Sequence, residues 1–401
     1  MQRPPIGQAA FVIRIVRLAT CCTALLLLRL RHDLKSGVVK SHIVGVVILR
    51  AAPESSTAKR LVDEVCYSLV GSLELFPMKF SKFFTAVAMC CAVGTFATSS
   101  FAADAAAPKR LTGGGSNIMY IITPSHSNPF FKTEAEVAAA TAKELGYEVK
   151  TVSHDDSPVK QSELFETAIS DRAAAIICDN AGADATVAAV QRAYDNNIPT
   201  FLIDREINEQ GIAIAQIVAN NYQGAKEAAE VFVEVMEEEG EYAELFGIDS
   251  DTNAQTRSTA FHEVIDQYPD MKLVAVQTAN WDQNLAYQKT ETILQSFPNL
   301  KGIISGNDNM AVGAAAAARA AGKTLHIIAV DGSNDARDEI IAGNMTATAM
   351  QPAALIAEMA VRQADQYLKT GSTGKPEKQL IDCELITIDN AKKLNNFALS
   401  E

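Results

Sequence analysis

Short apolar runs alternate with longer helical stretches along most of this chain, from residue 117 onward. The first runs, at residues 117–122 and 148–152, have the length of buried strands, and the alanine-rich stretch 132–145 lies between them. This alternation is the signature of right-handed βαβ units on a parallel sheet. It predicts about ten strands, which are too many for one small doubly wound sheet and suit two sheets of similar size.

The polar and aromatic residues that follow the predicted strands share one chemistry. Ligands bind at the carboxyl ends of the strands in open α/β sheets, so these residues are the candidate binding residues. They are Asn128, Phe130, Phe131, Asp204, Arg205, Arg257, Trp281, Asn307, Asp331 and Gln351. Carboxylates accept from hydroxyl groups, guanidinium and amide groups donate to their oxygens, and aromatic rings cover C–H faces. The set predicts binding of a small neutral sugar or polyol.

Some of these residues also have a purely structural interpretation. Asp308 or Asn309 is expected to cap the helix that follows, which leaves Asn307 as the better candidate for a ligand contact. Asp331 precedes a glycine and could be only a turn residue. Asp204–Arg205 could form an ion pair alone, although side chains at the carboxyl end of a strand face the cleft.

The composition excludes several other classes of function. A net charge of −13 argues against nucleic acid as a partner. No pair of Cys-x-x-Cys motifs and no His/Cys cluster is present, so we expect neither a metal nor a cofactor. Cys178 and Cys383 could form a disulfide or remain as two buried thiols. The sequence lacks a phosphate loop, a dinucleotide fingerprint and a nucleophile elbow, so we expect no enzymatic activity.

The segment before residue 104 has a different character. A short basic start at residues 78–82, an apolar core at 83–98 and small residues near Ala102 are the three parts of a secretory signal peptide. Because signal peptides begin a chain, we interpret 78–103 as the signal peptide, starting at Met78, and 1–77 as a spurious upstream extension. The alternative is a genuine N-terminal membrane anchor. Residues 104–116 then form a flexible lead-in, and the mature chain is expected in the periplasm.

Five motifs occur in one order along the chain: N-P-F-F at 128–131, I-D-R at 203–205, R-S-T-A-F at 257–261, N-D-N-M-A-V-G-A at 307–314 and V-D-G at 330–332. At these residues the chain resembles the periplasmic sugar-binding proteins of ABC transporters, of the ribose-binding type. The resemblance extends over nearly all of 117–388 and implies the same ten ligand contacts. Trp281 stands where a phenylalanine is usual in ribose binders, which leaves the identity of the sugar open.

The resemblance implies two similar doubly wound lobes joined by a three-crossing hinge. The N-terminal lobe is expected at 117–219 plus 352–380, and the C-terminal lobe at 220–351 plus 381–401. A pentose, hexose or polyol would bind between the lobes, which would close around it. The expected partner is the membrane permease of an ABC importer, with a chemoreceptor as a further candidate.

Two other classes of function compete with this one. The effector-binding domain of a sugar-responsive transcription repressor has the same two-lobed fold, but it needs an N-terminal helix-turn-helix, and residues 1–77 show no such pattern. An enzyme on a similar α/β frame would need a reactive group that the candidate residues do not supply.

If the protein is exported through this signal peptide, the N-terminus of the natural protein can be predicted. We expect translation to begin at Met78 and processing to remove residues up to about Ala102 or Ala103, because the small residues of a cleavage site lie there. Sequencing the N-terminus of the mature protein tests this. A terminus upstream of Met78 would contradict it.

Overall fold

A computed structural model describes residues 23–29, 44–50 and 109–400, which belong to two separate units, 1–103 and 104–401. In the first unit, β1 (Thr23–Arg29) pairs antiparallel with β2 (Val44–Arg50). The predicted signal peptide at 78–103 lies outside the described residues. Within the described ranges, no helix is both long enough and apolar enough to cross a membrane.

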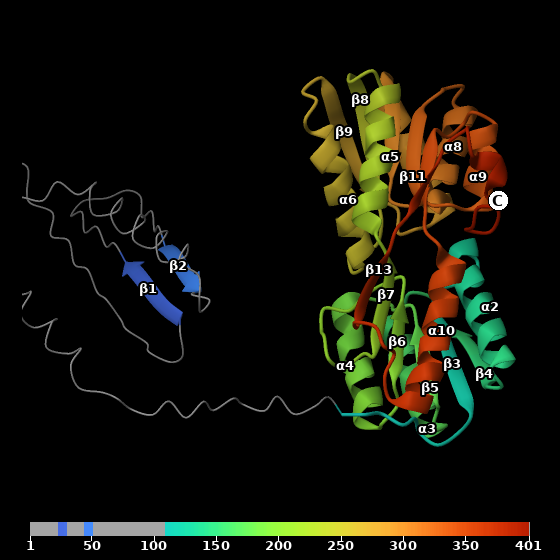
Figure 1. Ribbon diagram of the computed structural model, residues 1–401. Helices are drawn as coiled ribbons and strands as arrows, with labels where there is room; N and C mark the ends of the chain where they lie inside the picture. Colours follow the sequence, from blue (N-terminus) through green and yellow to red (C-terminus); the bar gives the residue numbers. More distant parts are fainter. Residues whose placement is uncertain (1–22, 30–43, 51–108, 401) are drawn as a thin grey trace, which may run out of the picture. The chain divides into compact units, whose positions relative to one another are not determined.

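The second unit begins with a six-stranded sheet. Its elements are β3 (Ile118–Thr123), α2 (Pro129–Glu144), β4 (Glu148–Ser153), α3 (Pro158–Ser170), β5 (Ala175–Cys178), α4 (Ala183–Asp195), β6 (Thr200–Ile203), β7 (Ala215–Ala219), α10 (Ala353–Thr370) and β13 (Lys378–Ile381). The strand order is β13-β7-β6-β5-β3-β4, and all neighbours are parallel. Figure 1 shows α10 beside α2 on this sheet.

Alternation along the strands explains why helices cover both faces of this sheet. Met119 and Ile121 of β3 pack in one cluster with α2 and α10. Tyr120 and Ile122, which point to the opposite face, pack in another cluster with α3 and α4. Because both faces are covered, the inner strands β3, β5, β6 and β7 are buried and largely apolar along their length, as parallel strands usually are.

A second six-stranded sheet repeats this arrangement. Its elements are α5 (Asn221–Val235), β8 (Gly240–Phe246), α6 (Thr252–Ile265), β9 (Met271–Thr278), α7 (Gln283–Ser296), β10 (Leu300–Ser305), α8 (Asp308–Ala320), β11 (His326–Asp331), α9 (Asn334–Ile341), β12 (Ala347–Met350) and β14 (Glu384–Ile386), followed by the short η1 (Ala391–Lys393). The strand order is β14-β12-β11-β10-β8-β9, and only the β12–β14 pair is antiparallel. Helices α5 and α6 pack together, as do α7 and α8.

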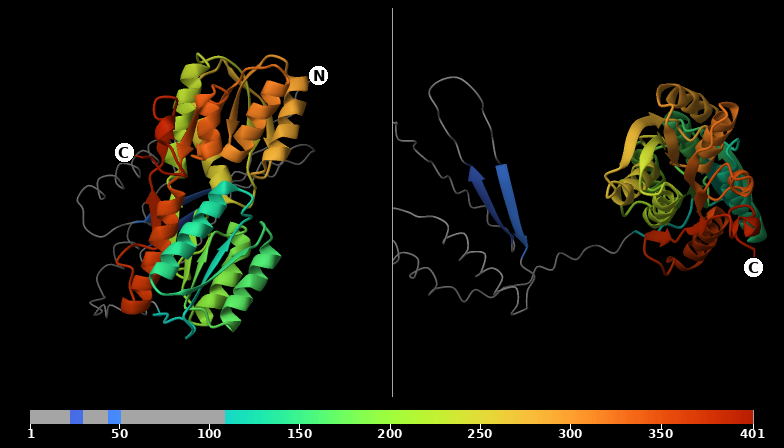
Figure 2. Two further views of the ribbon diagram at one scale, coloured as in Figure 1. Left: turned by 90° about the vertical axis from the view of Figure 1, so that its right-hand side faces the viewer. Right: turned by 90° about the horizontal axis from the view of Figure 1, so that it is seen from above.

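The two sheets confirm the predicted fold class of two doubly wound α/β lobes. In each sheet the second strand along the chain lies at one edge and the first lies beside it, so the order reverses next to β3 in one lobe and next to β8 in the other. Ligands of such sheets bind at this switch point, outside the carboxyl ends of the strands. Figures 1 and 2 show the two lobes stacked one above the other.

The stretch near the C-terminus is divided between the lobes. It supplies β13 to the first sheet and β14 to the second. Two further passages between the sheets lie between β7 and α5 and between β12 and α10. The chain described at 109–400 therefore crosses between the lobes three times.

The third crossing is attached to helix α5. Gln223 of α5 donates from Nε2 to the main-chain oxygen of Cys383, at 3.2 Å, and accepts from its N–H at Oε1, at 2.9 Å. A Cβ on Gly224 would lie 2.7 Å from the Cβ of Cys383, so this close approach requires a glycine. Cys383 and Cys178 are both buried and free.

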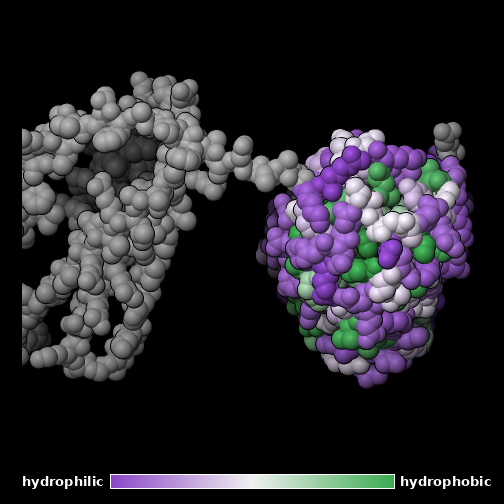
Figure 3. Space-filling model, turned by 90° about the horizontal axis from the view of Figure 1, so that it is seen from below, coloured by the Kyte–Doolittle hydropathy of each residue, from purple (hydrophilic) through white to green (hydrophobic). Residues whose placement is uncertain are grey.

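One buried cluster continues through both lobes. It contains residues of α2 and α10 in the first lobe and of α5 and α6 in the second, among them Ala138, Ile356, Phe232 and Phe261. The outer surface contrasts with it. Figure 3 shows a face at the end of the first lobe on which hydrophilic residues predominate and hydrophobic ones are scattered.

Candidate ligand-binding site

A small cavity lies where the carboxyl edges of the two sheets meet. Side chains of both lobes line it. They are Phe130, Phe131, Asp204, Arg205, Asp251, Asn253, Arg257, Trp281, Asn307, Asp331 and Gln351. The structure thus brings together every predicted site residue except Asn128, and adds Asp251 and Asn253. Contact between these residues and a ligand remains a prediction.

Asn128 serves the helix that carries the two phenylalanines. It is the N-cap of α2, and its Oδ1 accepts the N–H of Phe130 at 3.0 Å. Pro129 occupies the first helical position, where its missing N–H costs nothing. Phe130 packs edge-on against Phe131, with ring centroids 5.7 Å apart, and also against Phe397 near the C-terminus, at 5.2 Å. The cap therefore fixes the rings at the edge of the cavity.

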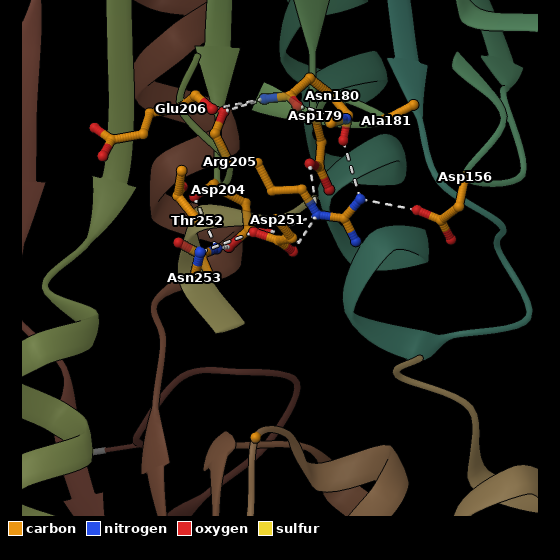
Figure 4. Close-up of polar contacts among 12 residues, drawn as sticks. Asp156, Asp179, Asn180, Ala181, Asp204, Arg205, Glu206, Asp251, Thr252 and Asn253 are labelled. Carbon is orange, nitrogen blue, oxygen red and sulfur yellow. Dashed lines mark hydrogen bonds and ion pairs between the residues drawn. The ribbon is translucent and has the colours of Figure 1, made fainter. Parts of the chain in front are cut away.

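Arg205 is the centre of the first lobe's contribution (Figure 4). Its Nη1 donates to Asp156 Oδ1 at 2.8 Å and to the main-chain oxygen of Asn180 at 2.9 Å. Its Nε lies 3.5 Å from Asp179 Oδ1 and 2.9 Å from Asp251 Oδ2. The pair with Asp251 joins the two lobes, because Asp251 is the N-cap of α6 in the second lobe. Arg205 Nε and Asp251 Oδ2 are close enough for an ion pair, but the two groups lack the geometry of a hydrogen bond.

Two further contacts join the lobes beside this ion pair. Asn253 donates from Nδ2 to the main-chain oxygen of Asp204 at 3.1 Å and to its Oδ1 at 3.2 Å. The N–H of Ala183 donates to the main-chain oxygen of Ser250 at 3.0 Å. Asp204 itself has a positive φ of 56°, which turns its side chain at the end of β6. The structure is therefore that of a closed pair of lobes.

Arg257 is the central polar residue on the second lobe's side of the site. Its Nε donates to Asn221 Oδ1 at 2.6 Å, and its Nη1 donates to the main-chain oxygen of Gly306 at 2.8 Å. The same Nη1 lies 3.5 Å from Asp331 Oδ1, and that carboxylate also accepts from Gln351 Nε2 at 2.9 Å. The ion pair is buried and hydrogen-bonded on both sides, which is the condition for a stable buried charge.

The cavity offers polar atoms to a ligand and aromatic surface beside them. Arg205 Nη2, Trp281 Nε1 and Gln351 Oε1 are buried and have no hydrogen-bond partner among residues 109–400. The guanidinium of Arg205 lies 4.9 Å from the centroid of the Phe131 ring, and that of Arg257 lies 5.5 Å from the Trp281 ring. Two donors and an acceptor next to aromatic faces match a ligand with hydroxyl groups and C–H surfaces.

Burial governs the charge of the lining carboxyl groups. It raises the pKa of Asp204 to about 6, with Asp251 adding to the rise and Arg257 opposing it. Burial also raises the pKa of Asp331 well above its ordinary value, again against the effect of Arg257. Two arginines and three carboxyl groups line the cavity, so the lining has no excess of positive charge that would attract an anionic ligand.

The sequence analysis missed four polar residues of this site. Asp251 and Asn253 follow β8, Asp179 follows β5 and Asp156 follows β4, so the same rule of strand ends could have found them. No cluster that could hold a metal is found in the described part of the chain.

The expected cap of helix α8 was wrong. Asn307, not Asp308 or Asn309, is its N-cap, and Asn307 Oδ1 accepts the N–H of Met310 at 3.0 Å. Asp308 is buried instead, where it accepts from the N–H of Ser333 at 2.6 Å and from Thr348 Oγ1 at 2.5 Å. These bonds fix the turn that follows Asp331, because Ser333 lies two residues beyond it.

Comparisons with known proteins agree on one family. Residues 119–373 match the periplasmic binding protein domain. A D-apiose import binding protein of Actinobacillus succinogenes is 58% identical over 286 residues, 71% of this chain and 92% of the relative. A D-apiose import binding protein of Paraburkholderia graminis is 54% identical over 323 residues, 80% of this chain and 100% of the relative.

A solved structure has the same fold. It is a periplasmic solute-binding protein of an ABC transporter from Actinobacillus succinogenes, with bound D-allose. The TM-score is 0.65 at 26% identity, and the match covers 69% of this chain and 99% of that one.

Truncation of one member of the Arg257–Asp331 pair tests the site. Asp331→Ala and Arg257→Ala each leave a buried partner unsatisfied, at a cost of about 1–3 kcal/mol or more. A loss of about 3 kcal/mol weakens binding more than a hundredfold, and we expect this loss in calorimetry with the sugar that binds the wild type. The fold should persist, because both side chains stand at the cavity rather than in an apolar core.

Glu238→Ala is the control, because Glu238 is exposed in the turn after α5. It should bind as the wild type does. Wild-type affinity in Asp331→Ala and Arg257→Ala would show that the ligand binds elsewhere.

Proposed function

This chain belongs to the periplasmic binding protein domain family, and on that premise we propose that it captures D-apiose between its two lobes and delivers it to an ABC importer. The observation that carries the proposal is the 58% and 54% identity to two D-apiose import binding proteins, each covered over at least nine-tenths of its length. The chain would act by binding and release, without a chemical step.

The lining of the cavity supports a ligand of this kind. D-Apiose is a neutral, branched pentose whose hydroxyl groups both donate and accept hydrogen bonds. Asp204 and Asp331 would accept from hydroxyl groups, while Arg205 and Arg257 would donate to their oxygens. Phe131 and Trp281 would cover the C–H faces of the ring from opposite lobes.

Closure would couple binding to transport. The contacts between Arg205 and Asp251 and between Asp204 and Asn253 exist only when the lobes approach each other. A ligand that contacts both lobes stabilises the closed state by the free energy of those added contacts. The permease could then distinguish the loaded protein from the empty one by the relative position of the lobes.

The periplasm is the proposed location, with export directed by a signal peptide that starts at Met78. The match of residues 119–373 to the periplasmic binding protein domain supports this location. Docking on a chemoreceptor, which the family resemblance also implies, stays a separate prediction.

Selectivity among sugars tests the proposed function. At a concentration about 100 times Kd, a ligand that binds only the folded state stabilises it by about 2.7 kcal/mol. In a thermal-shift panel of pentoses, hexoses and sugar alcohols, D-apiose should therefore give the largest rise in melting temperature.

The fluorescence of Trp281 provides a second measurement of binding with the same set of sugars. Trp281 is the one tryptophan of the chain and lines the cavity, so its fluorescence should change with the same sugar. Stabilisation by another monosaccharide in preference to D-apiose would replace the proposed ligand. Stabilisation only by amino acids or sugar phosphates would contradict the class of ligand.

A further inference from the structure

Two buried carboxyl groups lie behind the sugar cavity without lining it. Glu134 of α2 and Asp179, directly after β5, are both fully buried, and neither side chain reaches the cavity. All four of their oxygens lack a hydrogen-bond partner among residues 109–400 when both groups are taken as ionised. The Asp179 carboxyl is the charged neighbour that acts most strongly on Glu134, which makes it the candidate partner for a hydrogen bond. Such a bond needs one proton, because two carboxylates have no donor between them.

The cation that faces this pair is Arg205, and other carboxyl groups already share its charge. Arg205 is 3.5 Å from Asp179, but it is also 2.8 Å from Asp156, 2.9 Å from Asp251 and 3.9 Å from Asp204. A single guanidinium therefore meets four carboxyl groups before Glu134 is counted. An ionised Glu134 would be a buried charge without compensation, which proteins avoid by binding a proton.

The other titratable neighbours do not supply a counter-charge. His154 donates from Nε2 to the main-chain oxygen of Asp179, at 2.7 Å, and burial lowers the pKa of His154 to about 4, so it is neutral at neutral pH. Burial raises the pKa of the Cys178 thiol, which is neutral as well. Asp155 lies beyond His154 and pairs with Lys160 at 2.6 Å on the surface.

The pKa values of the pair agree with this geometry. Burial raises the pKa of Glu134 well above its ordinary value of 4.5, and Asp179 and Asp204 add to the rise while Arg205 opposes it. Burial likewise raises the pKa of Asp179, against the attraction of Arg205. Since Asp179 is the member nearer to the guanidinium, the proton belongs on Glu134.

We propose that Glu134 is a positioning residue: it stays a neutral acid at neutral pH, donates a hydrogen bond to Asp179, and so fixes the carboxylate that holds Arg205 at the sugar cavity. The proton comes from water and is held by the carboxyl pair, and no other group changes. Glutamine can replace the donor through its amide N–H, whereas leucine has a similar size and cannot donate. This difference separates a positioning role from simple filling of space.

The protonation is tested without any ligand. A group whose pKa is raised in the folded state contributes stability that is present below its ordinary pKa and is lost as the pH rises through the folded pKa. Glu134→Gln does not lose this stability as the pH rises, because its amide does not titrate. The melting temperature of Glu134→Gln minus that of the wild type should therefore grow by at least about 3 °C between about pH 5 and about pH 8.

Glu136→Gln, on the exposed face of the same helix, is the control and should show no such growth. A difference for Glu134→Gln that is constant with pH, or that becomes unfavourable as the pH rises, would show that Glu134 is ionised in the folded chain. Either result overturns the proposal.

The positioning role is tested with D-apiose, and this part rests on the proposed function. At neutral pH, Glu134→Gln should bind D-apiose within about threefold of the wild type, and Glu134→Leu should bind about tenfold more weakly or worse. Wild-type affinity in Glu134→Leu would refute the positioning role. If the wild type itself fails to bind D-apiose, the proposed ligand is wrong, and the pH dependence of the melting temperature still decides whether Glu134 carries the proton.

Discussion

The closed form of this protein depends on one buried guanidinium that both lobes share. Arg205 is fixed from the first lobe by Asp156 and by the main-chain oxygen of Asn180, and it meets Asp251 of the second lobe at 2.9 Å. A buried arginine is tolerated only where carboxylates and hydrogen-bond acceptors surround it. Most of its acceptors lie in the first lobe, so it is held in place there before the lobes meet. Closure adds the contact with Asp251, and the sugar would add its own oxygens at Nη2.

The fold places this group by repeating one topology twice. In each lobe the strand order reverses beside the first strand, so the loops that follow the central strands converge at one edge of the sheet. The three crossings between the lobes turn the two edges toward each other. Trp281 and the Arg257–Asp331 pair complete the cavity from the second lobe.

The strand-end rule predicted the residues that line the cavity, such as Phe131 and Asp331, because it depends only on local patterns. It did not predict Glu134, which belongs to a helix and becomes important only through its burial against Asp179. It also assigned the cap of α8 to the wrong residue, since the sequence does not show that Asp308 is needed by Ser333 and Thr348.

Small-angle X-ray scattering of the mature chain, with and without saturating D-apiose, tests most directly whether the closed cavity is the sugar-bound state. The account predicts that the sugar makes the chain more compact, and that the bound curve matches the closed arrangement with Arg205 beside Asp251. Superimposable curves with a bound sugar would contradict it, because the contacts between the lobes would then not depend on the ligand.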